Sequence, residues 1–484
     1  MPDDSEVRRL ALSCLLLGFV GPTPPAWLLA ALGEGLGGVV LFGSNVGDGG
    51  EQVRELTDRL RSAAGRDIVV AIDEEGGDVT RLDTLHGSAS PGAAALGALD
   101  DPAATEEVYA AIGARLAEAG VTLDLAPVAD VNVEPLNPVV GVRSFGAQSE
   151  LVARHVAAAV RGIQRGGTAA CLKHFPGHGA TRSDSHHQVA VLDRAADQLR
   201  AVEFVPFSAG IAAGSRAVMT GHLLAPALDA DALTTISAPI TRTLLRDELG
   251  FTGAVVTDAL EMRAVADTIG MVEGFVQALA AGADAIETGA LDYPELVEAI
   301  PRAVAAALAD GRLTLERLQD ASHRTAELAG VGDPQVRYDA DAVAGVPARC
   351  VEVSRPLPRL HAPLVVECRP PDGMASGALP WSLAGPLAQL VAGTEGIAVG
   401  SARDLAAVAA RADERSLVVV VRDPDRHAWQ DGAVALADAR PGSVIVDVGW
   451  PALLTGQTPV VRTRGVAPEL LRAAARALAE GGSP

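Results

Sequence analysis

The segment Lys173–His187 holds the densest group of side chains that can do chemistry. It contains four of the chain's ten histidines, together with Lys173 and Asp184. Imidazole titrates near neutral pH and can both give and take a proton, and a nearby carboxylate can orient the ring and support its cation. Pro176 and the glycines around His178 predict a loop. This loop therefore has the groups for general acid–base catalysis.

Metal binding is an alternative use of these histidines. No pair of them has the helical i,i+4 spacing with a carboxylate base in between, and the four cysteines show no C-x-x-C pairing. A G-x-G-x-x-G match at Gly33, Gly35 and Gly38 precedes a strand, so a dinucleotide phosphate would find no helix N-terminus there. We expect no metal and no cofactor.

Lys173 is the only lysine of the chain, because 38 of the 39 Lys and Arg residues are arginines. The sequence uses arginine almost everywhere that a cation is needed. A single surviving lysine indicates a place where a compact ammonium group fits and a planar guanidinium does not.

The formal net charge of -22 bears on the possible partners. Such an acidic surface repels phosphate backbones and anionic lipids, so nucleic acid and membrane are poor partners. No apolar run reaches the ~18 residues of a membrane span. The run Leu10–Val20 has signal-peptide length, but acidic residues precede it and no small-x-small cleavage site follows. We expect a buried first strand and a cytoplasmic protein, with secretion as the alternative.

Short apolar runs alternate with amphipathic stretches through the first 330 residues or so. This alternation predicts a parallel sheet, and eight repeats predict a closed (β/α)8 TIM barrel. The expected strands are Leu15–Phe19, Val39–Phe42, Ile68–Asp73, Val121–Val128, Ala169–Phe175, Ala217–His222, Ala254–Asp258 and Ala283–Thr288. The expected helices between them include Glu51–Ser62, Thr105–Ala119, Leu151–Arg165 and Gln198–Ala213.

Polar residues stand at the ends of five of these runs. In a TIM barrel the loops at the carboxyl ends of the strands form the mouth, where catalytic groups collect. Each residue alone could be a satisfied rim residue, but five together favour a site. They are Asp73, Lys173 with His174, His222, Asp258 and Glu287.

The pattern changes near residue 335. We expect the barrel to span 1–335, a linker 336–362, and a smaller open α/β sandwich domain 363–484. Within the last part, strands are expected at Leu364–Glu367, Ile397–Gly400, Leu417–Arg422 and Val444–Val448, and helices at Leu405–Ala412 and Pro468–Leu478. No polar cluster marks this part, so no chemistry is assigned to it.

Several ordered blocks resemble the β-N-acetylglucosaminidase branch of family 3 glycoside hydrolases. The signature loop is Lys173-His174-Phe175-Pro176-Gly177-His178-Gly179 followed by Asp184-Ser185-His186. Further blocks are Gly37–Phe42, Asp73–Gly77 with Arg81, Leu125–Asn132, Arg143–Gly146, Val218–His222 and Leu245–Phe251. The resemblance runs through most of the first 330 residues.

This resemblance implies roles for individual residues. The family's nucleophile is an Asp at the end of the seventh strand, which matches Asp258. Its general acid/base is a His paired with an Asp two residues earlier, which matches His186 and Asp184. Its sugar-binding positions match Asp73, Arg81, Arg143, Lys173 and His174.

The resemblance implies a retaining enzyme that hydrolyses terminal β-linked N-acetylglucosamine from peptidoglycan (muropeptide) fragments through a covalent glycosyl-aspartate. Three residues depart from the pattern or complicate it. Ala259 follows Asp258 where the family often has a second Asp, Asp78 stands where relatives commonly carry Arg, and His187 adjoins His186. The activity that the resemblance implies makes a small carbohydrate the expected partner.

Two other enzyme classes and one non-enzyme are alternatives for the same residues. A phosphorylase is possible because a His base tolerates an anionic acceptor that a Glu would repel. A β-glucosidase or β-xylosidase of the wider family resembles this chain less, because those enzymes take their acid from a Glu in the second domain. The non-enzyme alternative is a barrel that binds sugar without turnover.

Overall fold

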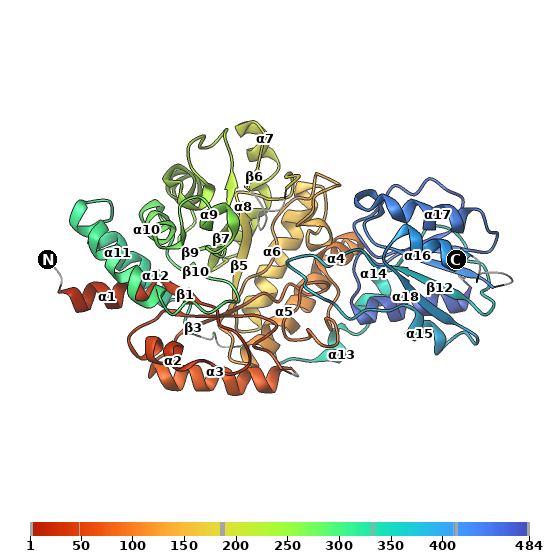
Figure 1. The fold of residues 1–484 in the computed structure, drawn as a ribbon, viewed down its shortest axis with the longest axis horizontal. Helices are drawn as coiled ribbons and strands as arrows, with labels where there is room; N and C mark the ends of the chain where they lie inside the picture. The colour runs from red at the N-terminus through yellow and green to blue at the C-terminus, as the bar shows by residue number, and fades with distance from the viewer. Residues whose placement is uncertain are drawn as a thin grey trace. The chain divides into compact units, whose positions relative to one another are not determined.

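The computed structural model describes residues 3–47, 49–183, 189–330, 332, 334–409, 411 and 415–481. None of the helices in these ranges is long and apolar enough to cross a membrane. Contacts divide the chain into two compact units, coloured along the sequence in Figure 1. Unit 1 is Met1–Glu75, Asp101–Val140 and Ser144–Ala340, and unit 2 is Gly76–Asp100, Gly141–Arg143 and Asp341–Pro484.

Eight parallel strands form the sheet of unit 1, and each overlaps one of the predicted strands. The order is β10-β1-β2-β3-β4-β5-β7-β9. An isolated parallel bridge between Val256 of β9 and Ala285, the residue before β10, joins the last strand of this order to the first and closes the barrel. The strands are β1 (Leu15–Leu17), β2 (Gly38–Leu41), β3 (Val69–Ile72), β4 (Leu123–Asp124), β5 (Ala169–Phe175), β7 (Ala217–Thr220), β9 (Ala254–Thr257) and β10 (Ile286–Glu287). The predicted (β/α)8 barrel is confirmed.

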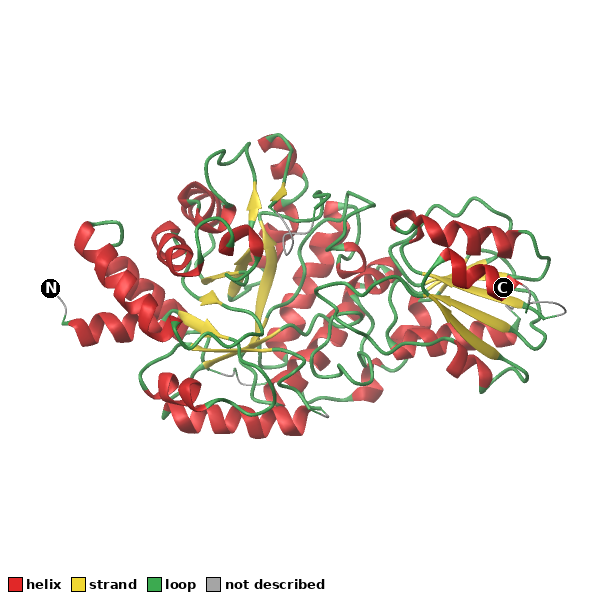
Figure 2. Cartoon of the chain, viewed as in Figure 1, coloured by secondary structure: helices red, strands yellow, loops and turns green. Residues whose placement is uncertain are grey.

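Helices between the strands surround the barrel (Figure 2). They are α1 (Asp4–Ser13), α2 (Ala26–Gly33), α3 (Gly50–Ala64), α5 (Pro102–Glu118), α6 (Ser149–Arg165), α7 (Ala196–Ala201), α8 (Phe204–Ala212), the π-helix η3 (Pro239–Glu248), α9 (Arg263–Ala266), α10 (Met271–Ala281), α11 (Leu296–Asp310) and α12 (Leu315–Ala326). The apolar run Leu10–Val20 forms the end of α1 and strand β1, as expected of a buried first strand.

Local sequence explains where the helices begin, end and approach each other. Asp101 caps α5 by accepting from the backbone N–H groups of the first turn, and Pro102 needs no hydrogen-bond acceptor there. The predicted helix Gln198–Ala213 is instead two helices. Pro206 lacks the N–H that would bond the Val202 carbonyl, so the chain breaks before α8. Helices α5 and α6 can pack closely because Gly113 has no Cβ. A Cβ at this position would lie 2.3 Å from the Ile163 carbonyl oxygen.

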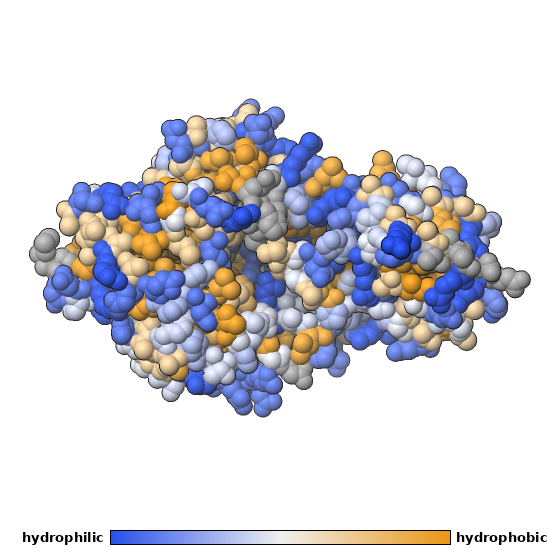
Figure 3. Space-filling model, viewed as in Figure 1, coloured by the Kyte–Doolittle hydropathy of each residue, from blue (hydrophilic) through white to orange (hydrophobic). Residues whose placement is uncertain are grey.

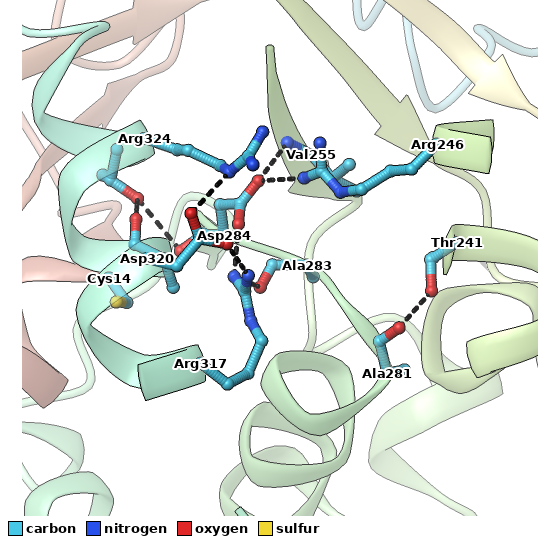
Figure 4. A network of polar contacts seen from close by, with 12 residues as sticks. Cys14, Thr241, Arg246, Val255, Ala281, Ala283, Asp284, Arg317, Asp320 and Arg324 are labelled. Carbon is cyan, nitrogen blue, oxygen red and sulfur yellow. Dashed lines mark hydrogen bonds and ion pairs between the residues drawn. The ribbon is translucent and has the colours of Figure 1, made fainter. Parts of the chain in front are cut away.

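A buried ion-pair network lies where β10 begins (Figure 4). Asp284 is fully buried and accepts hydrogen bonds from Arg246 Nη2 at 2.6 Å, from the Val255 N–H at 2.8 Å, and from Arg317. Burial raises the pKa of Asp284, while the two arginines lower it. The network ties η3 and α12 to the amino-terminal end of the sheet, where a TIM barrel keeps stability rather than catalysis.

Unit 2 has a six-stranded mixed sheet with the order β11-β16-β15-β14-β12-β13. Its strands are β11 (Glu352–Val353), β12 (Leu364–Cys368), β13 (Glu395–Val399), β14 (Leu417–Val421), β15 (Val444–Asp447) and β16 (Val460–Arg462). Helices α15 (Ala384–Ala388) and α18 (Pro468–Glu480) cover one face, and α16 (Ala402–Ala409) and α17 (Asp431–Asp438) cover the other. The predicted smaller α/β domain is confirmed.

Several features of unit 2 are absent from the sequence analysis. The predicted linker 336–362 contains α13 (Ala340–Val343), α14 (Val346–Cys350) and β11, which runs antiparallel to β16. The segment Gly76–Asp100, which the sequence pattern places within the barrel part, belongs to unit 2 and includes α4 (Ala93–Leu99). On the face seen in Figure 3, apolar residues are scattered among polar ones.

Candidate active site

The inner layer of the barrel explains why polar residues gather at its mouth. Side chains alternate along a strand, and the interior core contains Ala71, Cys171, Val256 and Ala285. The next inward positions toward the carboxyl ends of these strands are two residues further on. They are Asp73, Lys173, Asp258 and Glu287.

Lys173 forms a buried ion-pair cluster in this layer. Its residue is 1% exposed, and its Nζ lies 2.5 Å from Asp73 Oδ1 and 2.7 Å from Glu75 Oε1. The register of β5 against β7 shifts between Leu172 and Phe175, so β5 is irregular at Lys173. A compact ammonium with three donors suits this narrow place, as the sequence predicted for the single lysine.

His174 is oriented by a carboxylate that the sequence analysis did not single out. Asp130 is fully buried, and its Oδ2 lies 2.8 Å from His174 Nδ1. Burial alone would raise the pKa of Asp130, but His174 and His178 lower it overall. An ionised carboxylate only accepts hydrogen bonds, so Nδ1 of His174 donates to it.

His178 has a structural environment although it belongs to the same histidine-rich segment. The Thr181 hydroxyl donates to the His178 carbonyl at 2.9 Å and lies 2.7 Å from its Nδ1, so Nδ1 donates to that hydroxyl. Burial lowers the pKa of His178 to about 4. Its ring is therefore neutral at physiological pH and fixes the loop rather than transferring protons.

Asp258 follows β9 directly and is half-buried. Its backbone N–H donates to the Thr220 carbonyl at 3.0 Å, and its Oδ1 accepts from the Ala259 N–H at 2.8 Å. His222 is also one of the predicted strand-end residues. Its Nε2 lies 3.0 Å from the Ala259 carbonyl oxygen, and its Nδ1 lies 2.7 Å from the Thr235 hydroxyl oxygen. The His222 ring thus holds the turn that carries Asp258.

Two more buried carboxyl groups have raised pKa values. The pKa of Glu287 is raised well above its ordinary value. Burial is the largest cause, and the charges of Asp258 and Asp73 add to it. Burial likewise raises the pKa of Asp124 at the end of β4, although its Oδ1 accepts from the Glu74 N–H. Strongly shifted groups in a barrel mouth are typical of functional sites.

The other predicted site residues lie elsewhere in the structure. Arg81 and Arg143 belong by their contacts to unit 2, where Arg81 Nη2 donates to the Ala375 carbonyl at 3.0 Å. Arg143 ends the short helix η1 (Gly141–Arg143) beside α4. Asp184 and His186 lie outside the described residues, so their predicted roles as orienting carboxylate and acid/base stay predictions.

The sequence analysis missed Glu75 and Asp130 as site residues. Glu75 shares the alternation of Asp73, two residues earlier, and that spacing could have identified it. Asp130 follows β4 by several irregular residues, so no periodicity relates it to His174. Within the described part of the chain, groups of three or more His, Cys, Asp or Glu residues with the arrangement of a metal site are absent.

The geometry brings together a half-buried carboxylate, a buried lysine held by two carboxylates, and a carboxylate-oriented histidine at the mouth of a TIM barrel. These are groups that bind sugar hydroxyls and stabilise an oxocarbenium-like centre. A family model described as "Glycosyl hydrolase family 3 N terminal domain" matches residues 30–328. The chain belongs to this family and is a glycoside hydrolase.

Individual relatives agree with this assignment. A solved structure of a glycoside hydrolase family 3 beta-N-acetylglucosaminidase from Paenibacillus sp. is 30% identical with a TM-score of 0.87, covering 98% of this chain and 97% of that one. Beta-hexosaminidase from Xylella fastidiosa is 37% identical over 60% of this chain and 87% of its own length. Beta-hexosaminidase A from Pseudoalteromonas piscicida is 36% identical over 51% of this chain, and the match spans 45% of that relative.

Proposed function

We propose that this glycoside hydrolase is a retaining β-N-acetylglucosaminidase. It releases terminal β-linked N-acetylglucosamine, and its natural substrates are peptidoglycan (muropeptide) fragments. Support for the sugar comes from the relatives named beta-hexosaminidase and beta-N-acetylglucosaminidase. We propose the muropeptide source from the family resemblance, and a cytoplasmic location from the acidic residues that precede Leu10–Val20.

The observation that carries the mechanism is the position of Asp258 in the same layer as Asp73, Lys173 and Glu287. A retaining glycosidase needs a carboxylate beneath the anomeric carbon. Asp258 attacks this carbon and forms the covalent glycosyl-aspartate. The bond to the leaving oxygen breaks as His186, oriented by Asp184, protonates that oxygen. His186 then takes a proton from water, which attacks the anomeric carbon and frees Asp258.

Asp73, Lys173 and His174 hold the sugar from fixed positions. The Lys173–Asp73 pair presents a donor and an acceptor that are already oriented before the sugar arrives, so little side-chain entropy is lost on binding. Arg81 and Arg143 supply planar donors for hydroxyls or for the acetamido carbonyl.

Trapping the intermediate tests this proposal. Wild type should be labelled at Asp258 by a 5-fluoro derivative of an activated N-acetylglucosaminide, and peptide mapping by mass spectrometry should locate the label. Asp258→Asn should keep sugar binding and lose both labelling and turnover. Label on another carboxylate would overturn the assignment.

The acceptor is tested in the same assay. Turnover of nitrophenyl N-acetylglucosaminide should release free sugar at the same rate with and without phosphate. Sugar 1-phosphate as the main product would show the phosphorylase instead. Faster cleavage of a disaccharide muropeptide fragment than of chitobiose would support the proposed source, and the reverse order would contradict it.

A further inference from the structure

Glu287 is the last residue of β10 and the least explained polar group of the barrel mouth. Only 4% of the residue is exposed. Ala285, two residues earlier, lies in the interior core, so Glu287 extends into the layer above it. Burial and then the charges of Asp258 and Asp73 raise the pKa of Glu287, which agrees with a position close to both carboxylates.

The carboxyl group of Glu287 is incompletely satisfied. Its Oε2 is buried without a hydrogen-bond partner among the described residues. Asp284, only three residues earlier and also buried, accepts from two arginines and a backbone N–H. Buried polar atoms in native proteins almost always have a partner, so an orphaned oxygen in a binding site indicates a ligand contact.

We propose that Glu287 is a further substrate-binding residue, whose carboxyl group hydrogen-bonds a sugar hydroxyl between Asp258 and Asp73. The inference rests on the proposed function, because it takes Asp258 as the group beneath the anomeric carbon. It adds a contact that neither the family motif nor the predicted site residues include.

The strand order implies that Glu287 and Lys173 face opposite edges of the sugar. Going round the closed barrel from β9 to β3, one route passes β10, β1 and β2, and the other passes β7, β5 and β4. Glu287 stands on the first route and Lys173 on the second. A pyranose ring that reaches from Asp258 to Asp73 therefore presents one edge to Glu287 and the opposite edge to Lys173.

These two edges carry different groups. From the anomeric carbon to carbon 4, one edge carries the substituents of carbons 2 and 3, and the other carries the ring oxygen and the 6-hydroxymethyl group. Deoxy sugars therefore identify the hydroxyl that Glu287 contacts, because 3-deoxy and 6-deoxy substrates each remove a donor from one edge.

The protonation state fits a hydroxyl partner. Burial and the two neighbouring carboxylates raise the pKa of Glu287 well above its ordinary value, which favours the protonated form. A neutral carboxyl group donates through its O–H and accepts through its carbonyl oxygen, and a hydroxyl can serve either role. A neutral group also avoids repulsion with the nucleophilic carboxylate of Asp258.

The test compares Glu287→Gln, Glu287→Asp and Glu287→Leu with wild type on nitrophenyl N-acetylglucosaminide and its 3-deoxy and 6-deoxy analogues. Glutamine keeps a neutral donor and acceptor, so kcat/KM should stay within about threefold. Leucine should lower kcat/KM about 10- to 100-fold on the parent sugar. It should cause little loss on the one deoxy analogue that lacks the contacted hydroxyl. Aspartate, one methylene shorter, should show the same pattern more weakly.

Asp447→Asn is the matched control, because Asp447 is a buried carboxyl at the end of the parallel strand β15 in unit 2. It should leave all three kcat/KM values unchanged. Equal losses on the parent and both deoxy sugars, in the leucine and aspartate variants alike, would overturn the role of Glu287. A failure of the proposed function appears differently, as absent turnover or absent Asp258 labelling in wild type.

Discussion

Asp130 Oδ2 lies 2.8 Å from His174 Nδ1 in a fully buried position. The other oxygen of this carboxylate accepts from the His178 N–H at 2.7 Å and from the His174 N–H at 3.2 Å. One buried charge therefore fixes both the ring of His174, a proposed sugar-binding residue, and the backbone of the loop that continues toward Asp184 and His186.

Asp130→Asn should disturb this arrangement without removing its shape. The amide loses the charge that holds His174, and one of its two ends donates instead of accepting. A hydrogen bond to a charged group contributes about 1.5 to 3 kcal/mol, so kcat/KM should fall about 10- to 100-fold. Steady-state kinetics on an activated N-acetylglucosaminide provide the measurement. The matched control is Asp229→Asn, which removes a half-buried carboxylate bound to Ser237 and should leave kcat/KM unchanged.

Lys173→Met should be more damaging than Lys173→Arg, and both should impair the enzyme. Methionine removes the ammonium group that pairs with Asp73 and Glu75, and breaking a buried pair costs about 3 to 5 kcal/mol. Arginine keeps the charge but not the compact shape, so KM should rise. Thermal unfolding and kinetics measure the two effects. A fully active Lys173→Arg variant would contradict the shape argument.

The single lysine also allows a chemical test. Because Lys173 is 1% exposed and paired twice, an amine-directed acylating reagent should modify it slowly in the folded protein. A sugar analogue that fills the site should slow the modification further. Mass spectrometry of the intact chain, with the α-amino group as an internal reference, follows the reaction. Rapid labelling in the folded state would show that the ion-pair cluster opens.

Sequence reasoning recovered the barrel because its signals are local. Every strand is a short apolar run, and the residues that end these runs lie at the mouth because parallel strands share one carboxyl-end edge. That is why Asp73, Lys173 and Asp258 could be placed together in advance. Asp130 could not, since its relation to His174 arises across 44 residues through an irregular segment after β4.

The same limit explains what was missed in unit 2. Asp78 follows the block Asp73–Gly77 and stands where relatives of the family commonly carry Arg. The structure shows its carboxylate accepting from Arg422 Nη2 at 2.8 Å and from the Val466 N–H at 2.9 Å. Contacts separated by more than 340 residues leave no periodic trace in a single sequence.

Asp78→Ala should therefore loosen the segment Gly76–Asp100 from the rest of unit 2. The change leaves the Arg422 guanidinium and a buried N–H without their shared acceptor, which should lower the stability of this unit by about 3 kcal/mol. Limited proteolysis should cut the segment faster than in wild type. A double-mutant cycle with Arg422→Met isolates the ion pair, and full additivity of the two changes would contradict a coupling between them.

Asp284→Asn should destabilise the barrel without changing its chemistry. The substitution removes the charge that two arginines share at the amino-terminal end of the sheet, so the free energy of unfolding should fall by about 3 to 5 kcal/mol. Denaturant unfolding measures this loss, and kcat at a temperature below the transition should be unchanged. The exposed pair Arg54–Asp58 offers the control, because Asp58→Asn should cost less than about 1 kcal/mol.

Asp447 should give unit 2 a pH-dependent stability. Burial raises its pKa to about 7 from an ordinary 3.8, although the N–H groups of Ala452 and Gly449 favour the charged form. The folded state therefore binds this proton more tightly than the unfolded chain. The stability that the protonated carboxyl contributes is complete below about pH 4. It is lost as the pH rises toward 7, and does not change further above that value.

Asp447→Asn cannot ionise and should remove this dependence. In calorimetric scans, the stability of wild type relative to the variant should fall between about pH 4 and pH 7 and then level off. Asp425→Asn, at an exposed position on η4 (Pro424–Arg426), should keep the wild-type pH profile. A constant difference between wild type and Asp447→Asn across this range would mean that Asp447 is ionised throughout, and that its backbone hydrogen bonds outweigh the cost of burial.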